Sequence, residues 1–244
     1  MSGIAVVTGA DRGLGLALTS NLLSQGWKVF AGQFMSDWAE LDGLVRRYPD
    51  HLTVVPLDVS SQSSAKDAAQ AVRQETDRVD MIINNAGINA LHRDRTIRES
   101  QDYEEIHKVY DINSLGPLRV VEAFLQLTDQ SEMKRLCFVS SEAGSIARAH
   151  RPAWFGYSMS KAALNMGVRI LFNYLRPEGY MFRLYHPGGI RSYIGGTGVK
   201  GTRSGQEPEE AAIPALAHFL ENNEHPTAED HLIMMDHRGQ EWPW

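Results

Sequence analysis

The sequence contains a single cysteine, Cys137, so it cannot form an internal disulfide. One unpaired thiol fits a reducing compartment. The chain also lacks any apolar run of about 18 residues, the length that a membrane-spanning helix needs. From Met1 it enters a strand-like apolar pattern directly, without the basic segment and cleavage site of a signal peptide. These absences predict a cytoplasmic protein that does not span a membrane.

An excess of positive charge is missing as well. The 244 residues carry a formal net charge of −6, which gives no electrostatic reason to bind nucleic acid or an anionic membrane. No metal site is predicted. A hydrophobic content of 43% is typical of an ordinary globular protein. The length predicts one α/β domain over residues 1–244 and is short for two.

A glycine-rich turn lies near the amino terminus, between a strand pattern and a helix pattern. The apolar run 4–7 is typical of a parallel strand buried on both faces, and leucines at helical spacing follow the turn. Free amides at a helix start bind anions, and glycines let a ligand approach the backbone. The turn therefore predicts a phosphate site, although many glycine-rich loops are plain turns. Its residues are Gly9, Asp11, Arg12, Gly13, Leu14 and Gly15.

The end of the second predicted strand, 27–32, bears on the choice of cofactor. In dinucleotide-binding folds, an acidic side chain there binds the 2′-hydroxyl of the adenosine ribose. Here the strand is followed by Gln33, and no carboxylate is well placed to repel a 2′-phosphate. Arg12 could contact such a phosphate, so the sequence favours NADP while leaving NAD open. The alternative is that Arg12 is a solvated loop charge and that Asp37 caps the next helix.

Strand and helix patterns alternate through the rest of the chain. The alternation predicts a doubly wound, Rossmann-type parallel sheet of about seven strands, with helices on both faces. Such sheets bind ligands at the carboxyl ends of their strands. Further strands are predicted at 52–57, 79–83, 135–139, 180–185 and 232–235, and helices after Ser60 or Ser61, at 99–128, around Tyr157 to about 175, and at 208–220.

Polar residues and glycines follow several of these strands. The fourth strand ends in Asn84-Asn85-Ala86-Gly87, which suits a ligand edge or a common turn. Asn113 lies inside the long helical pattern, and Gly116-Pro117 after it predicts a break that exposes backbone carbonyls. Residues 190–207 lack periodicity and predict a mobile flap over the substrate.

Tyr157 and Lys161 are four residues apart in a predicted helix, so they share one face. A nearby ammonium favours the phenolate, and the pair could exchange a proton with a substrate oxygen near neutral pH. A Tyr and a Lys at this spacing are more often an ordinary surface pair. The other motifs of the chain give the pair its significance.

Five motifs occur together, in order: Thr8-Gly-x-x-x-Gly13-x-Gly15, Asn84-Asn85-Ala86-Gly87, Ser140-Ser141, Tyr157-x-x-x-Lys161 and Pro187-Gly188. In this set the chain resembles the short-chain dehydrogenase/reductase family over essentially its whole length. The long spacing from serine to tyrosine and the Gly-Gln-Glu-Trp-Pro-Trp ending are similar to the C-factor-like branch, which includes carbonyl reductases.

The resemblance implies an NAD(P)-dependent oxidoreductase of a small carbonyl or alcohol substrate. Tyr157 would be the general acid, Lys161 would lower its pKa and hold the nicotinamide ribose, and Asn113 would support a relay water. Ser141 would polarise the substrate oxygen, with Ser140 and Ser145 as alternatives, and Ser192 stands where the family has a threonine. The implied cofactor-binding residues are Gly9, Asp11, Arg12, Gly13, Leu14, Gly15, Gln33, Asp58, Val59, Asn85, Ala86, Gly87, Tyr157, Lys161, Pro187, Gly188 and Ile190.

Two other functions are compatible with such a fold. One is a dinucleotide-binding regulatory or signalling protein with little turnover, since a fold does not by itself fix a function. The other is an epimerase or dehydratase of nucleotide sugars, which usually has a larger substrate domain than this chain leaves room for. The resemblance also implies a homodimer or homotetramer, formed through the helices around Asn113 and Tyr157.

Overall fold

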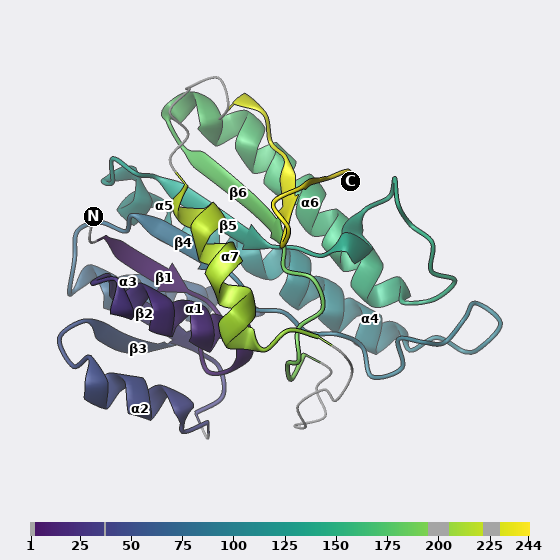
Figure 1. Cartoon of the computed structure of the whole chain (residues 1–244), viewed down its shortest axis with the longest axis horizontal. Coiled ribbons are helices and arrows are strands. Elements are labelled where there is room, and N and C mark those ends of the chain that lie inside the picture. Colours follow the sequence, from purple (N-terminus) through teal and green to yellow (C-terminus); the bar gives the residue numbers. More distant parts are fainter. Residues whose placement is uncertain (1–2, 37, 195–204, 222–229) are drawn as a thin grey trace.

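In the computed structural model, which describes residues 3–36, 38–194, 205–221 and 230–244, the strands form one sheet in the order β3-β2-β1-β4-β5-β6-β7-β8 (Figure 1). Neighbouring strands are parallel except for β8, which pairs antiparallel with β7. The order reverses between β1 and β4, which is where a doubly wound sheet opens a crevice at its carboxyl edge. The strands are β1 (Ile4–Val7), β2 (Lys28–Gln33), β3 (Leu52–Pro56), β4 (Met81–Asn84), β5 (Arg135–Val139), β6 (Met181–His186), β7 (Met234–Asp236) and β8 (Glu241–Trp242).

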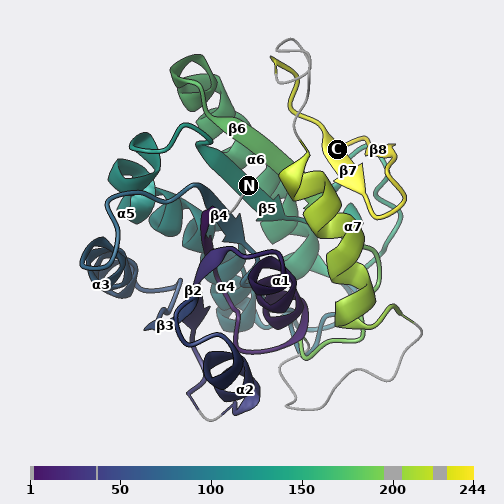
Figure 2. The ribbon, with the colours of Figure 1, turned by 60° about the vertical axis from the view of Figure 1, so that its left-hand side comes forward.

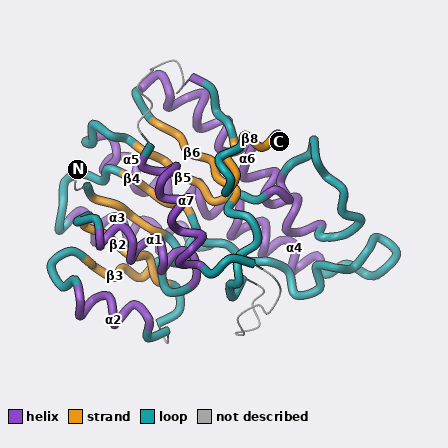
Figure 3. The backbone as a smooth tube through the Cα atoms, viewed as in Figure 1, coloured by secondary structure: helices purple, strands orange, loops and turns teal. Residues whose placement is uncertain are grey.

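Helices cover both faces of this sheet (Figures 2 and 3). One layer contains α1 (Gly13–Ser24), α2 (Glu40–Arg47) and α7 (Pro208–Leu220), and the other contains α3 (Gln62–Arg73), α5 (Gly116–Asp129) and α6 (Phe155–Leu175). Alternate residues of one strand enter opposite cores: Val6 packs under α3 and α5, whereas Ala5 and Val7 pack under α1. This explains why the strands are apolar at successive positions.

The long helical segment before β5 is interrupted at Asn113. Helix α4 (Tyr103–Tyr110) passes into a π-helical turn over Asp111–Leu115, and α5 follows from Gly116. A Cβ on Gly116 would lie 3.0 Å from Cγ2 of Val59, so the glycine lets the helix start approach the segment after β3. Pro117 stands in the first turn of α5, where its missing N–H is tolerated.

The predicted α/β architecture is confirmed, with differences at the ends of elements. The helix predicted from residue 99 begins at Tyr103, because Asp102 caps it by accepting a hydrogen bond from the Glu105 amide. Ser61, not Ser60, caps α3. Strand β7 starts two residues later than predicted, and the sequence analysis missed β8. Most of the predicted flap, 195–204, and the proposed cap Asp37 lie outside the described residues.

Candidate active site

The carboxyl ends of β1 and β4 are joined by a reciprocal set of hydrogen bonds. Thr8 Oγ1 accepts from the amides of Asn85 and Ala86, at 3.0 Å each. The Asn85 side chain donates Nδ2 to the carbonyls of Thr8 (3.0 Å) and Gly9 (3.2 Å). Asn85, predicted to line the cofactor, therefore uses its side-chain amide to hold the glycine-rich turn against β4.

The glycine-rich turn leaves the start of α1 open. Gly9 and Gly13 have φ values of 61° and 57°, in the left-handed region that favours glycine. A Cβ on Gly15 would lie 2.0 Å from the Gly9 carbonyl oxygen, so no larger residue fits. Arg12 precedes the helix without capping it through its side chain. The first amides of α1 are thus available for an anion, with Leu14 buried behind them.

Asp11 and Arg12 turn toward the segment after β2. Oδ2 of Asp11 accepts from the Met35 amide (3.3 Å) and from Nη1 of Arg12 (3.1 Å), and burial raises the pKa of this carboxyl against the effect of Arg12. The Arg12 guanidinium lies 4.8 Å from the ring centre of Trp38, which meets Tyr193 edge-on. Arg12 is therefore not a freely solvated loop charge.

The neighbouring strand ends are well ordered by local contacts. Gln33 ends β2, and its carbonyl accepts from the Leu57 amide. Asp58 directs Oδ1 to the amide and hydroxyl of Ser60, which shapes the entry to α3. Val59 packs on Gly116. None of these strand ends carries a carboxylate beyond that of Asp58.

The three candidate serines after β5 have different partners. Ser140 is buried and donates to Oδ1 of Asn165 (2.6 Å), and Ser145 donates to the Pro243 carbonyl (2.5 Å). Oγ of Ser141 accepts from the Ala143 amide (3.2 Å), and this side chain is near enough to the Tyr157 phenol to lower the pKa of that group. Of the three, Ser141 is thus the serine that influences the tyrosine, and its catalytic role stays a prediction.

Tyr157 lies in the first turn of α6 and is only 9% exposed. Burial raises the pKa of its phenol, and Glu142 raises it further, while Ser141, Arg93 and Arg151 oppose the shift. Burial dominates the pKa of this phenol, and the lowering by Lys161 that the resemblance implies stays a prediction. The phenol is held in its protonated form.

Lys161 is 4% exposed, and its ammonium donates to the Val139 carbonyl at 2.9 Å. The ammonium nitrogen lies 5.9 Å from the Tyr157 ring centre and 3.7 Å from where a Cβ on Gly87 would stand. Burial lowers the pKa of Lys161 to about 8. Tyr157, Lys161 and Gly87 therefore converge at the carboxyl edge, although they come from α6 and from the end of β4.

Asn113 is fully buried, and its side chain is completely engaged. Oδ1 accepts from the Ile88 amide, and Nδ2 donates to the Ile88 carbonyl, both at 2.9 Å. Nδ2 also lies 3.0 Å from Oγ of Ser160. The side chain thus positions the segment after β4, and the relay water implied by the resemblance stays a prediction.

Pro187 and Gly188 follow β6 at the same edge. Gly188 has a φ of 76°, and a Cβ there would lie 2.9 Å from the His237 ring. Ile190 forms an isolated bridge with Gln206, and the Ser192 Cβ would lie 3.7 Å from a Cβ on Gly13. The segment after β6 therefore borders the glycine-rich turn.

The sequence analysis missed Thr8 as a brace and assigned no role to Trp154. Trp154 precedes α6 with a φ of 68°, unusual for a bulky residue, and its ring lies 6.2 Å from that of Tyr157. No sequence pattern predicts the left-handed backbone conformation of Trp154. The position of Trp154 just before the predicted helix was the available signal.

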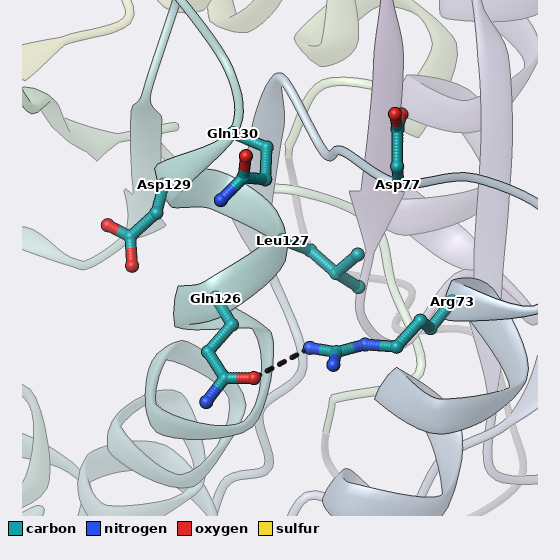
Figure 4. Close-up of a pocket in the computed structure, with 6 residues that line it drawn as sticks. All are labelled: Arg73, Asp77, Gln126, Leu127, Asp129 and Gln130. Atoms are coloured by element: carbon teal, nitrogen blue, oxygen red, sulfur yellow. Dashed lines mark hydrogen bonds between the residues drawn. The ribbon is translucent and has the colours of Figure 1, made fainter.

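Two cavities lie away from the place where Tyr157, Lys161 and Gly87 meet, and Tyr157 lines neither of them. The larger, of about 380 Å³, lies between α3 and α5, lined by Arg73, Asp77, Gln126, Leu127, Asp129 and Gln130 (Figure 4). These residues precede β4 and β5, so the cavity is at the amino edge of the sheet. The smaller, of about 160 Å³, is walled by Glu142, Arg151 and the outer side of α6 near Met159.

Within the described ranges, no helix is long and apolar enough to cross a membrane. The same ranges contain no cluster of three or more His, Cys, Asp or Glu side chains that could hold a metal ion.

Comparison with known proteins places this geometry among oxidoreductases. Residues 3–199 match the family model described as short chain dehydrogenase. An uncharacterized oxidoreductase of Schizosaccharomyces pombe is 34% identical over 80% of this chain and 76% of its own. C-signal of Myxococcus xanthus is 34% identical over 69% of this chain and 95% of its own. The NADPH-bound carbonyl reductase from chicken fatty liver has a TM-score of 0.85, with 28% identity over 100% and 99% of the two chains.

Burial of the Lys161 ammonium predicts that Lys161→Met stabilises the folded protein. The folded pKa of about 8 is below the ordinary 10.5, so the charged lysine costs stability at neutral pH. The methionine variant should have a free energy of unfolding about 1–3 kcal/mol higher at pH 7. The advantage should shrink as the pH rises from about 8 to 10.5, where the folded lysine is neutral and the unfolded one is charged. Urea titration at several pH values measures the difference in free energy of unfolding. A Lys161→Met variant that is less stable than the wild type at pH 7 contradicts the prediction.

Proposed function

The chain belongs to the short-chain dehydrogenase family and is an NAD(P)-dependent oxidoreductase, and from that premise we propose that it reduces a ketone or aldehyde with NADPH, reversibly. The observation that carries the proposal is the buried Tyr157, with the Ser141 side chain near its phenol and the buried Lys161 ammonium 5.9 Å from its ring centre, at the carboxyl edge. Two hydroxyls and an ammonium at one strand edge suit proton transfer to a carbonyl oxygen.

The residues at this edge fit a dinucleotide. Gly9 and Gly13 present no side chain that would obstruct a pyrophosphate, and the first amides of α1 are uncapped. Gly87 presents bare backbone beside the Lys161 ammonium, which suits a ribose hydroxyl. When bound, the nicotinamide would supply or accept the hydride.

Each residue of the site would have a distinct role. Ser141 would donate a hydrogen bond to the substrate oxygen and polarise its carbonyl group. Tyr157 would transfer its phenolic proton to the same oxygen as it gains negative charge, and its raised pKa keeps that proton in place beforehand. Lys161 would stabilise the phenolate that results. Asn113 would hold the segment at Ile88 that faces them.

Tyr157→Phe should reduce the kcat for carbonyl reduction by at least about 100-fold, because the proton donor is lost. NADPH affinity should change less than about threefold, since the ring remains. Stopped-flow absorbance of NADPH and calorimetric titration measure the two quantities. A kcat within tenfold of the wild type refutes the assignment.

The same measurements test the alternative of a dinucleotide-binding regulatory protein. Tight NADPH binding by the wild type, with no turnover over a broad panel of ketones, aldehydes and alcohols, would favour that alternative. The similarity to C-signal is the observation that supports this second candidate function.

A preference for NADPH over NADH is supported by Arg12 and by the absence of a carboxylate at Gln33. Arg12→Ala should weaken NADPH binding by about 10-fold or more and NADH binding by less than about twofold, because an arginine binds a phosphate through charge-assisted hydrogen bonds. Arg73→Ala, at the distant cavity, is the matched control. If calorimetric titration shows that Arg12→Ala weakens the binding of NADPH and NADH equally, Arg12 does not recognise the 2′-phosphate.

A second copy of the chain is the proposed partner of α6. Met166, Ile170 and Tyr174, four residues apart on one side of this helix, are 59%, 61% and 71% exposed, and Met159 extends the stripe. An apolar stripe of this length is costly to leave in water, and two copies can cover each other's stripes.

Replacing both Met166 and Ile170 by lysine should convert the oligomer to a monomer, since four charges would face one another across a twofold interface. Ile213→Lys on α7, where Ile213 is 64% exposed, is the control and should leave the mass unchanged. Light scattering after size exclusion measures the masses. An unchanged mass for the double variant, or a monomeric wild type, contradicts the proposal.

A further inference from the structure

One segment of the chain beside the site contains only basic charged residues, although the protein is acidic overall. Its net charge is −6, yet no acidic residue occurs between Glu142 and Glu178, a stretch that includes Arg148, Arg151 and Lys161. The loop after β4 approaches the same place and contributes Arg93. Glu142 and Asp94 lie beside two of these arginines, so the attraction that an anion meets there depends on how each arginine is paired.

Trp154 joins the two loops. Its amide donates to the Arg93 carbonyl (2.8 Å), and its indole Nε1 donates to Oδ1 of Asp94 (2.7 Å). Its left-handed backbone conformation is one that a bulky residue adopts only when its surroundings enforce it, and such strain gathers at ligand sites. The ring lies edge-on to Tyr157. The indole is thus a fixed platform beside the phenol.

A guanidinium group lies over this platform from each loop. Cζ of Arg93 is 4.5 Å and Cζ of Arg151 is 4.6 Å from the Trp154 ring. Both side chains are about one quarter exposed, so ligands can reach them. Stacking on an aromatic ring fixes the plane of a guanidinium and leaves its N–H edge free to bind an oxyanion.

The two arginines differ in their acidic partners. Arg151 is satisfied by Glu142 through two parallel hydrogen bonds, of 2.9 and 2.5 Å. The Arg93 Nε stands 3.9 Å from the Asp94 carboxylate, too far for a hydrogen bond, and that carboxylate is 71% exposed and engaged by Trp154. Arg93 therefore retains donor capacity next to the site, which a purely structural stacking role would not require.

We propose that Arg93 binds an anionic group of the substrate, so that the preferred substrate is a ketone or aldehyde that also bears a carboxylate. Arg151, neutralised by Glu142, packs against the Trp154 platform as a positioning residue. The carboxylate would form charge-assisted hydrogen bonds with the Arg93 guanidinium while the carbonyl oxygen lies at Ser141 and Tyr157. The inference rests on the proposed carbonyl reduction and deepens it.

Pairs of substrates that differ only in carrying a carboxylate or its methyl ester separate the effect of the negative charge from that of the carbonyl group. Levulinate and its methyl ester form one pair, and carboxybenzaldehyde and its methyl ester form another. With NADPH, the wild type should show a kcat/KM at least about 10-fold higher for each acid than for its ester, the range expected of a charge-assisted hydrogen bond. Arg93→Gln should lower kcat/KM for the acids by about 10–100-fold, mainly through KM, and change the esters less than about twofold.

Two further variants exclude trivial explanations. Arg93→Lys should recover part of the acid preference, because it restores the charge without the fork geometry. Arg95→Gln removes a charge two residues away, where the side chain bonds the Ser100 carbonyl, and should leave the acid-to-ester ratio unchanged. Loss of the ratio in Arg95→Gln, or equal losses for acids and esters in Arg93→Gln, overturns the proposal.

Calorimetric titration of benzoate in the presence of NADPH separates this inference from the proposed function. Turnover of esters and acids at equal rates overturns the anion site and leaves carbonyl reduction standing. Absence of turnover for all four compounds refutes reduction of this substrate class, and benzoate titration then decides the anion site alone. Binding that Arg93→Gln weakens by about 10-fold or more supports the site, and equal or undetectable binding in both proteins overturns it.

Discussion

The mutual bracing of Thr8 and Asn85 is the constraint on which the site depends. One hydroxyl and one amide tie the end of β1 to the end of β4 through four hydrogen bonds, each with a main-chain partner. Because both ends are fixed to each other, the glycine-rich turn and the segment leading to Gly87 keep one relative position. Gly87 in turn lies beside Lys161 and Asn113. The crevice is therefore built into the junction of two strands rather than assembled by loops.

Behind this junction, the protein buries polar groups that a core selected for stability alone would avoid. Lys161 has a carbonyl partner and a pKa lowered by burial, and Tyr157 has a pKa raised by the same cause. Opposite shifts in neighbouring groups leave an ammonium that gives up its proton more readily and a phenol that retains its own. Ser140 and Asn165 form a further buried polar pair that holds the strand end beneath them.

The sequence was sufficient for the architecture, because the apolar strands and the glycine spacing follow from local chemistry. It also identified Ser141, Tyr157, Lys161 and Gly87 as neighbours. It could not assign Asn85 to bracing, since an amide at a strand end binds a ligand or the backbone equally well. It could not show how deeply the tertiary structure buries the Tyr157 phenol, and this burial raises the pKa of the phenol. Strand β8 is too short to leave a periodic signal.

The π-helical turn at Asp111–Leu115 has a geometric consequence for everything placed along this segment. A π turn accommodates one residue more than an α turn, so side chains after it are rotated by about 100° relative to an uninterrupted helix. A helical wheel drawn through residues 103–129 as one rod would assign wrong faces to half of it. Asn113 lies within this turn and contacts Ile88, so the irregular backbone also sets the direction of the side chain that holds the segment after β4.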